Sequence, residues 1–180
     1  MKDQTKRISK LMSYVLRHNP AELDLDMDEQ GWVSVEQLID NARSKGKTIS
    51  LDLVKEVVIT NDKKRFSISE DGKRVRANQG HSITIDLSLK AVTPPSVLLH
   101  GTATKNLDSI MKQGLNKMNR HHVHLSENKS TALAVGTRYG KPILLKIDAE
   151  RMADDGFEFY RSENDVWLVE LVPAEYIQFE

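Results

Sequence analysis

The first part of the chain repeats hydrophobic residues with the period of an α-helix. Apolar residues at i, i+3, i+4 and i+7 predict a helix over residues 5–19 with one buried stripe. The stripe consists of Ile8, Leu11, Met12, Val15 and Leu16. At about 100° per residue, His18 falls on the flank of this stripe and Arg17 falls nearly opposite it. Pro20 disfavours helical backbone at Asn19, so the helix is predicted to end there.

Two more helices are predicted over residues 35–45 and 51–60, each preceded by a serine that can cap it. Ser34 and Gln37 have the spacing of a capping box, in which each side chain bonds the backbone N–H of the other residue. Ser50 can cap the second of these helices. The residues of that helix predicted to face inward are Leu51, Val54, Val57 and Val58.

A β-hairpin is predicted after these helices. Two alternating runs in KRFSISEDGKRVRA flank the turn sequence EDG. The segment WVSV is predicted to be a short strand, and the acidic LDLDMDEQG before it is predicted to be a solvated loop. Three helices followed by a hairpin resemble a winged-helix module, which we place at residues 1–80. Trp32, Trp167, Phe66 and Tyr14 are predicted to be packing residues rather than platforms for base stacking.

The second half of the chain has the pattern of a lobe dominated by strands. The turn-rich segments NQGHS and TPPS predict a linker over residues 81–95. Predicted strands follow in SVLLHGT, HVHLS, KPILLKID, DVWLVEL and YIQFE. Thr104 is predicted to cap a helix that ends at Gly114, and Ser126 to cap a helix over 127–135. The fold class predicted is therefore α+β, with a mixed β lobe at residues 96–180.

The amino-acid composition excludes few classes of function. The chain has 180 residues, with 26 Lys and Arg against 26 Asp and Glu, so net charge indicates no class of partner. It contains no cysteine, which excludes disulfides and thiolate metal sites and suits a reducing compartment. Its first residues lack the apolar core of a signal peptide, and no run is long enough to span a membrane. We therefore expect a cytoplasmic protein without a membrane partner; nothing indicates an obligate protein partner.

Several basic residues are candidates for binding an anion such as phosphate, whose oxygens match the planar guanidinium group. One candidate is the pair Arg17 and His18, a second is Arg138 after the predicted 127–135 helix, and a third is the hairpin. The basic residues of the hairpin region are Lys63, Lys64, Arg65, Lys73, Arg74 and Arg76. The alternative readings are structural: the helix dipole favours a cation at a helix C-terminus, and basic hairpin residues commonly form a solvated face.

The histidines offer a second kind of candidate. In a strand, His122 and His124 share one face and His121 takes the other, which could suit a metal. Neither cysteine nor a well-spaced carboxylate accompanies them, so we expect hydrogen bonding to a polar ligand and no metal. His100 ends a buried apolar strand, and Gly101 allows another group to approach the backbone closely. The alternative for His100 is a buried histidine with a satisfied partner.

Eight segments, taken together and in order, resemble the RNA 2′-phosphotransferase family over about residues 8–173. They are SKLMSYVLRHNP, DEQGWVSVEQLI, KKRFSI, RANQGHS, LLHGT, GLNKMNRHHVHLS, VGTRYGKP and NDVWLVE. The resemblance implies a winged-helix-like RNA-binding lobe and an ADP-ribosyltransferase-like lobe that binds NAD. It implies that NAD is consumed as co-substrate without a metal, and that the partner is tRNA-like RNA with an internal 2′-phosphate.

The resemblance also assigns residues. The catalytic residues it implies are Arg17, His18, Arg65 and Arg138. The NAD-binding residues are His100, Gly101, Thr102, Arg120, His122, His124, Leu125, Ser126 and Val166. The RNA-binding residues are Lys63, Lys64, Lys73, Arg74 and Arg76. Val166 takes the third position of the NAD signature, commonly Glu in toxin-like relatives, and Glu170 lies close enough to compete for it.

The reaction implied has two steps and three products. The RNA 2′-phosphate displaces nicotinamide from the nicotinamide ribose of NAD, and the ribose 2″-hydroxyl then attacks the phosphorus and releases RNA with a 2′-hydroxyl. The products are this RNA, nicotinamide and ADP-ribose 1″,2″-cyclic phosphate. Two other functions stay open: an ADP-ribosyltransferase acting on protein or on nucleic-acid ends, and a winged-helix nucleic-acid binder without catalysis.

Overall fold

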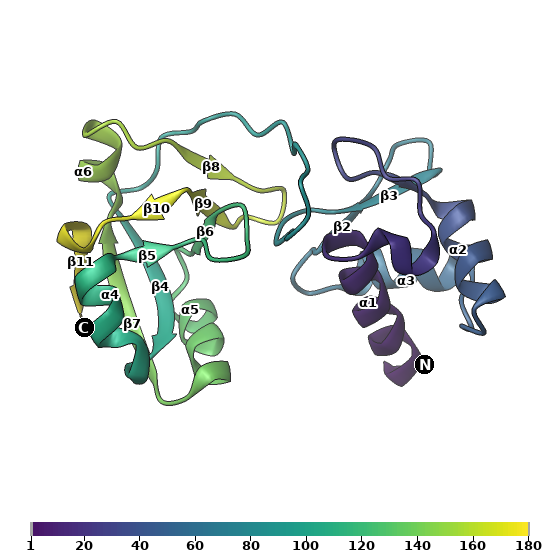
Figure 1. The fold of residues 1–180 in the computed structure, drawn as a ribbon, viewed down its shortest axis with the longest axis horizontal. Helices are drawn as coiled ribbons and strands as arrows, with labels where there is room; N and C mark the ends of the chain where they lie inside the picture. Colours follow the sequence, from purple (N-terminus) through teal and green to yellow (C-terminus); the bar gives the residue numbers. More distant parts are fainter. Residues whose placement is uncertain (1, 180) are drawn as a thin grey trace. The chain divides into compact units, whose positions relative to one another are not determined.

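The computed structural model describes residues 2–179 and contains two compact units, one ending at Ser88 and the other beginning at Leu89 (Figure 1). Each unit has its own hydrophobic core. The division between them falls inside the predicted linker, residues 81–95. The outermost positions of the predicted lobes, residues 1 and 180, lie outside the described residues. Within the described residues, no helix is long and apolar enough to cross a membrane.

The first unit begins with α1, Lys2–Arg17, whose apolar stripe is buried as predicted. The helix ends two residues earlier than predicted, at Arg17, and a short 3-10 helix, η1 (Pro20–Leu23), follows. The prediction that Tyr14 is a packing residue is wrong, because 46% of it is exposed. Its hydroxyl instead accepts a hydrogen bond of 3.1 Å from the side-chain amide of Asn19.

The next two helices are α2, Val35–Ser44, and α3, Leu51–Thr60. The hydroxyls of Ser34 and Ser50 cap them as predicted. The side chain of Gln37 does not complete the capping box; it exchanges two hydrogen bonds with Asp26. Leu51, predicted to face inward, is 42% exposed, because it is the first residue of α3 and lies at the margin of the core.

A three-stranded antiparallel sheet completes the regular structure of this unit. Its strands are β1 (Val33–Ser34), β2 (Phe66–Ile68) and β3 (Arg74–Ala77), in the order β1-β3-β2. The predicted hairpin between β2 and β3 is confirmed, and Gly72 adopts a φ of 73° in its turn.

The segment after β3 has no regular structure, yet it packs onto the first unit. The backbone N–H of Ser82 donates to the carbonyl of Arg17, and that of Asp86 donates to the carbonyl of Glu29. His81, directly before Ser82, is buried. In the second unit, Ala91 forms an isolated bridge with Tyr160. Backbone hydrogen bonds therefore hold the predicted linker at several points.

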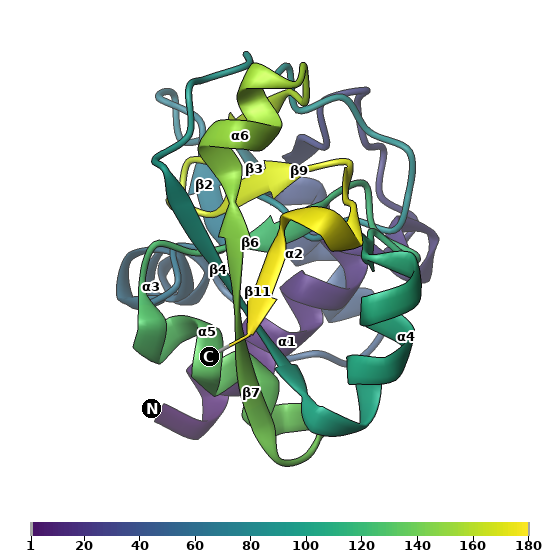
Figure 2. The same cartoon turned by 90° about the vertical axis from the view of Figure 1, so that its left-hand side faces the viewer.

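The second unit contains two three-stranded sheets and one two-stranded sheet, all with antiparallel pairing. The first has the order β11-β7-β4, and Figure 2 shows β7 between its two neighbours. The others have the orders β6-β9-β8 and β10-β5. The strands are β4 (Val97–Ala103), β5 (Leu115–Asn116), β6 (Val123–Leu125), β7 (Pro142–Asp148), β8 (Phe159–Arg161), β9 (Trp167–Val169), β10 (Leu171–Val172) and β11 (Ile177–Phe179).

Short helices accompany these sheets. They are η2 (Thr104–Asn106), α4 (Leu107–Gln113), α5 (Lys129–Gly136), η3 (Thr137–Tyr139), α6 (Ala149–Asp154) and η4 (Ala174–Tyr176). Two predicted caps are wrong. Thr104 lies inside η2 and caps nothing, and α5 is capped by Asn128, whose side-chain oxygen accepts from the N–H of Thr131. The mixture of helices and small antiparallel sheets is compatible with the predicted α+β class.

Candidate functional site

Arg17 ends α1 and His18 follows it; the segment 78–82 contacts both residues and leaves His18 exposed. The imidazole Nδ1 of His18 lies 2.9 Å from the hydroxyl of Ser82, and the N–H of Ser82 donates to the Arg17 carbonyl over 2.9 Å. The guanidinium of Arg17 lies against Gly80, since a Cβ added there would be 3.6 Å from its Nη1. Arg17 was predicted to point away from the core stripe, yet its Nε and Nη2 are buried because this segment folds over it.

Arg65 is positioned at the start of β2 by two asparagines. The side-chain oxygen of Asn61, at the end of α3, accepts from the backbone N–H and from Nη1 of Arg65, each at 3.4 Å. On the other side, the N–H of Asn78 donates to the Arg65 carbonyl, and the buried Asn78 side chain donates to the carbonyl of Lys64. The same short segment that holds Arg17 and His18 therefore also fixes the backbone of Arg65.

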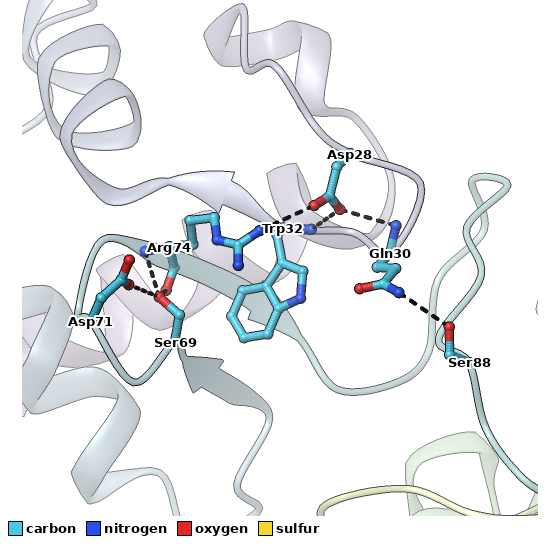
Figure 3. Close-up of polar contacts among 7 residues, drawn as sticks. All are labelled: Asp28, Gln30, Trp32, Ser69, Asp71, Arg74 and Ser88. Atoms are coloured by element: carbon cyan, nitrogen blue, oxygen red, sulfur yellow. Dashed lines mark hydrogen bonds and ion pairs between the residues drawn. The ribbon is translucent and has the colours of Figure 1, made fainter.

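The basic residues of the hairpin are partly engaged within the unit. The guanidinium carbons of Arg74 and Arg76 lie 5.5 and 4.6 Å from the centroid of the Trp32 ring. Arg74 also forms an ion pair of 3.5 Å with Asp28, whose other oxygen accepts from the N–H groups of Gln30 and Trp32 (Figure 3). Trp32 is half-buried beneath these arginines, as expected of a packing residue. The loop predicted to be merely solvated thus holds Arg74 in place.

In the second unit, His100 on β4 is connected to the strand that carries His124. Nδ1 of His100 lies 3.0 Å from the His124 carbonyl, which can only accept, so Nδ1 carries the hydrogen. Burial lowers the pKa of His100; the bond to His124 acts in the opposite direction, and the nearby charge of Arg120 lowers the pKa further. His100 is consequently neutral near pH 7, and its Nε2 is a hydrogen-bond acceptor.

His124 itself is oriented by Arg120, whose Nη1 lies 3.4 Å from its Nδ1. Two residues earlier, His122 packs against the ring of Tyr160 at a centroid distance of 5.5 Å. Burial lowers the pKa of His122 as well. The three side chains come from the exposed loop before β6 and from β6 itself.

Residue 101 has to be glycine because the helix α5 packs directly against the backbone there. A Cβ at this position would lie 1.6 Å from the carbonyl oxygen of Ala132, so α5 runs directly against β4 here. Gly136 makes the reciprocal approach, with its Cβ position 2.7 Å from the carbonyl of Thr102. The close approach predicted at Gly101 is real, and the group that makes it is the backbone of α5. Thr102 is buried and accepts a hydrogen bond from Asn106.

The end of β6 is fastened to β4 by Ser126. Its N–H and carbonyl exchange hydrogen bonds of 2.9 and 2.8 Å with Leu99, and its hydroxyl accepts from the N–H of Asn128. The following residue, Glu127, accepts a hydrogen bond of 2.7 Å from the indole of Trp167. Leu125 is buried between these contacts. Ser126 therefore lies beside the His100 strand in a fixed backbone.

Val166 and Glu170, which compete for the third position of the NAD signature, lie at opposite ends of β9. Val166 is half-buried in a turn closed by Ser162, whose hydroxyl accepts from its N–H. Glu170 is exposed and forms an ion pair of 3.0 Å with Lys117, which lowers the pKa of Glu170.

Arg138 is exposed within η3, directly after α5. Among residues 2–179, no group of three or more His, Asp or Glu side chains is arranged to hold a metal ion.

The sequence model of the RNA 2′-phosphotransferase, Tpt1/KptA family matches residues 3–171. The chain is 53% identical to a probable RNA 2′-phosphotransferase of Acaryochloris marina, with 98% of this chain and 97% of the relative covered. It is 53% identical to one of Rhodopirellula baltica, covering 95% and 94%, and 50% identical to one of Burkholderia pseudomallei, covering 96% and 94%. The chain belongs to the RNA 2′-phosphotransferase family. The resemblance seen in its motifs is thereby confirmed.

In this RNA 2′-phosphotransferase family member, the structure adds residues to which sequence reasoning gave no role. Asn61, Asn78, Gly80 and Ser82 contact the predicted catalytic residues of the first unit or the backbone beside them. Three of them lie in RANQGHS, whose turn-forming composition indicated only a loop. No signal in the sequence marked these residues, because the burial of Asn78 and its hydrogen bonds are visible only in the structure.

Proposed function

We propose that this protein removes an internal 2′-phosphate from RNA with NAD as co-substrate, through an ADP-ribosylated 2′-phosphate intermediate. The products are RNA with a 2′-hydroxyl, nicotinamide and ADP-ribose 1″,2″-cyclic phosphate. The observation that carries the proposal is the family match over residues 3–171, because it spans both units and all four predicted catalytic residues. The order α1, β1, α2, α3, β2, β3 supports a winged-helix-like RNA lobe. We assign an ADP-ribosyltransferase-like fold to the second unit.

The basic side chains of the first unit suit the phosphate of a branched RNA. Arg17, His18 and Arg65 are each tied to the segment 78–82 or its neighbours, so their backbones are ordered before any ligand binds. Guanidinium groups bind phosphate oxygens in pairs of hydrogen bonds, and preorganised donors of this kind stabilise charge on a transferring phosphoryl group. Arg138, from the second unit, is the fourth residue of this proposal.

The second unit has groups that suit a dinucleotide. The neutral His100 presents Nε2 as an acceptor, which fits a ribose hydroxyl donor. Arg120, His124 and Ser126 lie on the segment hydrogen-bonded to the same strand, and they supply further polar groups. We assign to these four residues the role of hydrogen bonding to the sugar and phosphate groups of NAD.

The chemistry of each step explains why these residue types suffice. A phosphate monoester has a second pKa of about 6, so at pH 7 it is already a charged nucleophile and needs no general base. A hydrophobic residue such as Val166 is therefore compatible with the first step. Orientation of the two reactants contributes more, up to about 7 to 11 kcal/mol in favourable cases. In the second step, the arginines stabilise the charge that develops on the phosphate oxygens.

Affinity for RNA is assigned to the hairpin face. Lys63, Lys64 and Lys73 are exposed and can reach backbone phosphates, which position RNA without reading its sequence. Arg74 and Arg76 are held by Trp32 and contribute charge from a fixed place. The 2′-position of the ribose distinguishes RNA from DNA, so we expect RNA as substrate.

The test is incubation with NAD and a defined oligoribonucleotide that carries one internal 2′-phosphate, with the products separated. We expect equal amounts of nicotinamide, cyclic phosphodiester and dephosphorylated RNA. The matched control is the same oligonucleotide without the 2′-phosphate, which should release no nicotinamide. Equal nicotinamide release from both would indicate a glycohydrolase, and ADP-ribose retained on the RNA or on protein would indicate an ADP-ribosyltransferase.

A further inference from the structure

Ser82 contacts both residues of the Arg17-His18 pair from 64 positions away in the sequence. Its hydroxyl lies 2.9 Å from Nδ1 of His18, and its backbone N–H donates to the carbonyl of Arg17 over 2.9 Å. The two contacts fix both the backbone and the side chain of Ser82 against the end of α1. They also place a hydrogen-bonding oxygen at one ring nitrogen of His18.

The segment that carries Ser82 is itself constrained. Gly80 adopts a φ of 85°, in the region that favours glycine, and lies against the Arg17 guanidinium. His81 is only 2% exposed, so the residue next to Ser82 is anchored in the unit. Asn78 ties the start of the segment to the carbonyls of Lys64 and Arg65. The ordered backbone of this segment therefore positions Ser82 next to His18.

We propose that Ser82 is a positioning residue that accepts a hydrogen bond from Nδ1–H of His18 and thereby fixes the tautomer of the ring. This inference rests on the proposed function. The tautomer of a neutral histidine follows from the hydrogen bonds of its ring nitrogens, and a serine hydroxyl can accept from Nδ1–H. With the hydrogen on Nδ1, the lone pair of the neutral ring lies on Nε2.

The second step then gives His18 a defined proton path. The ribose 2″-oxygen forms a bond to phosphorus, and its proton passes to Nε2, which makes the ring an imidazolium. The bond between phosphorus and the RNA 2′-oxygen breaks, and Nε2 returns the same proton to that leaving oxygen. Nδ1–H donates to Ser82 before, during and after the transfer, so the ring keeps one orientation throughout.

The experiment compares Ser82→Ala and Ser82→Thr with the wild type. Thr84→Ala is the matched control, because Thr84 is exposed on the same segment and has no assigned role. We expect Ser82→Ala to lower kcat about tenfold, the scale of one lost positioning hydrogen bond, with little change in KM for RNA. Because the first step needs no proton transfer, the ADP-ribosylated RNA should accumulate in this variant. Ser82→Thr, which keeps the hydroxyl, should restore turnover.

A spectroscopic measurement tests the tautomer without relying on turnover. With ¹⁵N-labelled histidine, the wild-type protein should show neutral His18 with its hydrogen on Nδ1, and Ser82→Ala should shift it toward Nε2–H. A wild-type ring already in the Nε2–H form would overturn the inference, as would wild-type kinetics in Ser82→Ala. If the wild type fails to dephosphorylate RNA, the proposed function fails, whereas the tautomer measurement still decides the contact between Ser82 and His18.

Discussion

Gly101 of β4 and Ala132 of α5 approach so closely that no side chain fits between them. A Cβ on residue 101 would stand 1.6 Å from the Ala132 carbonyl oxygen, and the obstructing atom is backbone. Backbone cannot rotate out of the way as a flexible side chain can. The position of α5 relative to the His100 strand is therefore set by a glycine directly after His100.

Gly101→Ala should consequently displace α5 and destabilise the second unit. Overpacking of an interior commonly costs about 1 to 3 kcal/mol, and a contact with backbone falls at the upper end of that range. We expect a lower midpoint in urea unfolding together with a loss of 2′-phosphate removal. Ala134→Ser, at an exposed position of α5, is the control and should unfold like the wild type. An unchanged midpoint in Gly101→Ala would contradict the packing described here.

Arg65→Ala should lower the rate of 2′-phosphate removal by at least about 100-fold without unfolding the protein. The magnitude is that of other groups that stabilise transition-state charge. The fold should survive because the side chain of Arg65 is half-exposed and its hydrogen bond to Asn61 is long, at 3.4 Å. Single-turnover kinetics measures the rate, and circular dichroism checks the fold.

Arg7→Ala is the comparison for Arg65, since Arg7 is an exposed arginine of α1 that pairs only with Asp3 in the contacts described. Removing such a surface pair changes stability by about 0 to 1 kcal/mol and should leave the rate unchanged. Near-normal turnover of Arg65→Ala would show that Arg65 is not a catalytic residue. Equal losses in both variants would indicate a general effect of charge.

Much of the fold could be predicted because its elements carry local signals. The stripe of α1, the caps Ser34 and Ser50 and the hairpin turn at Gly72 each depend on residues close in sequence. One error arises where two residues compete for the same role. Ser126 and Asn128 could both cap α5, and the structure uses Asn128 while Ser126 stabilises the turn before it.

The candidate site was harder to predict because its supporting contacts join distant residues. Composition marked NQGHS as a turn-rich linker, yet Ser82 bonds His18 and Asn78 bonds the backbone of Arg65. No period or motif encodes hydrogen bonds across such separations. In the same way, Gly101 indicated a close approach without revealing that α5 makes it.

Asp28→Asn should strengthen binding of RNA to the hairpin face. Asp28 pairs with Arg74 over 3.5 Å and thereby offsets part of its charge, whereas asparagine can still accept from Gln30 and Trp32. Without the carboxylate of Asp28, the positive charge of Arg74 is no longer partly neutralised and attracts a phosphate more strongly. We expect a several-fold gain in affinity at low salt and a slope of log K against log salt that is steeper by about 1.

Fluorescence anisotropy with a 2′-phosphorylated oligoribonucleotide, without NAD, measures this effect. Asp26→Asn is the matched control because it removes one negative charge from the same loop, where Asp26 bonds Gln37 rather than an arginine. The same gain in both variants would show that only net charge matters. A loss of affinity in Asp28→Asn would indicate that RNA needs Arg74 in its present orientation.

The histidines of the second unit should make its stability fall in mild acid. Burial lowers the pKa of His100 and of His122 below the ordinary value of 6.5, so the unfolded chain binds protons that the folded unit does not. The free energy of unfolding therefore decreases as the pH drops below about 6.5, until the folded histidines themselves titrate. Each group contributes at most about 1.4 kcal/mol per pH unit in that window.

Urea unfolding at pH about 7.5 and about 5.5 should show this decrease in the wild type. The decrease should be smaller in the double variant His100→Gln, His122→Gln. An identical decrease in both proteins would mean that other groups cause it.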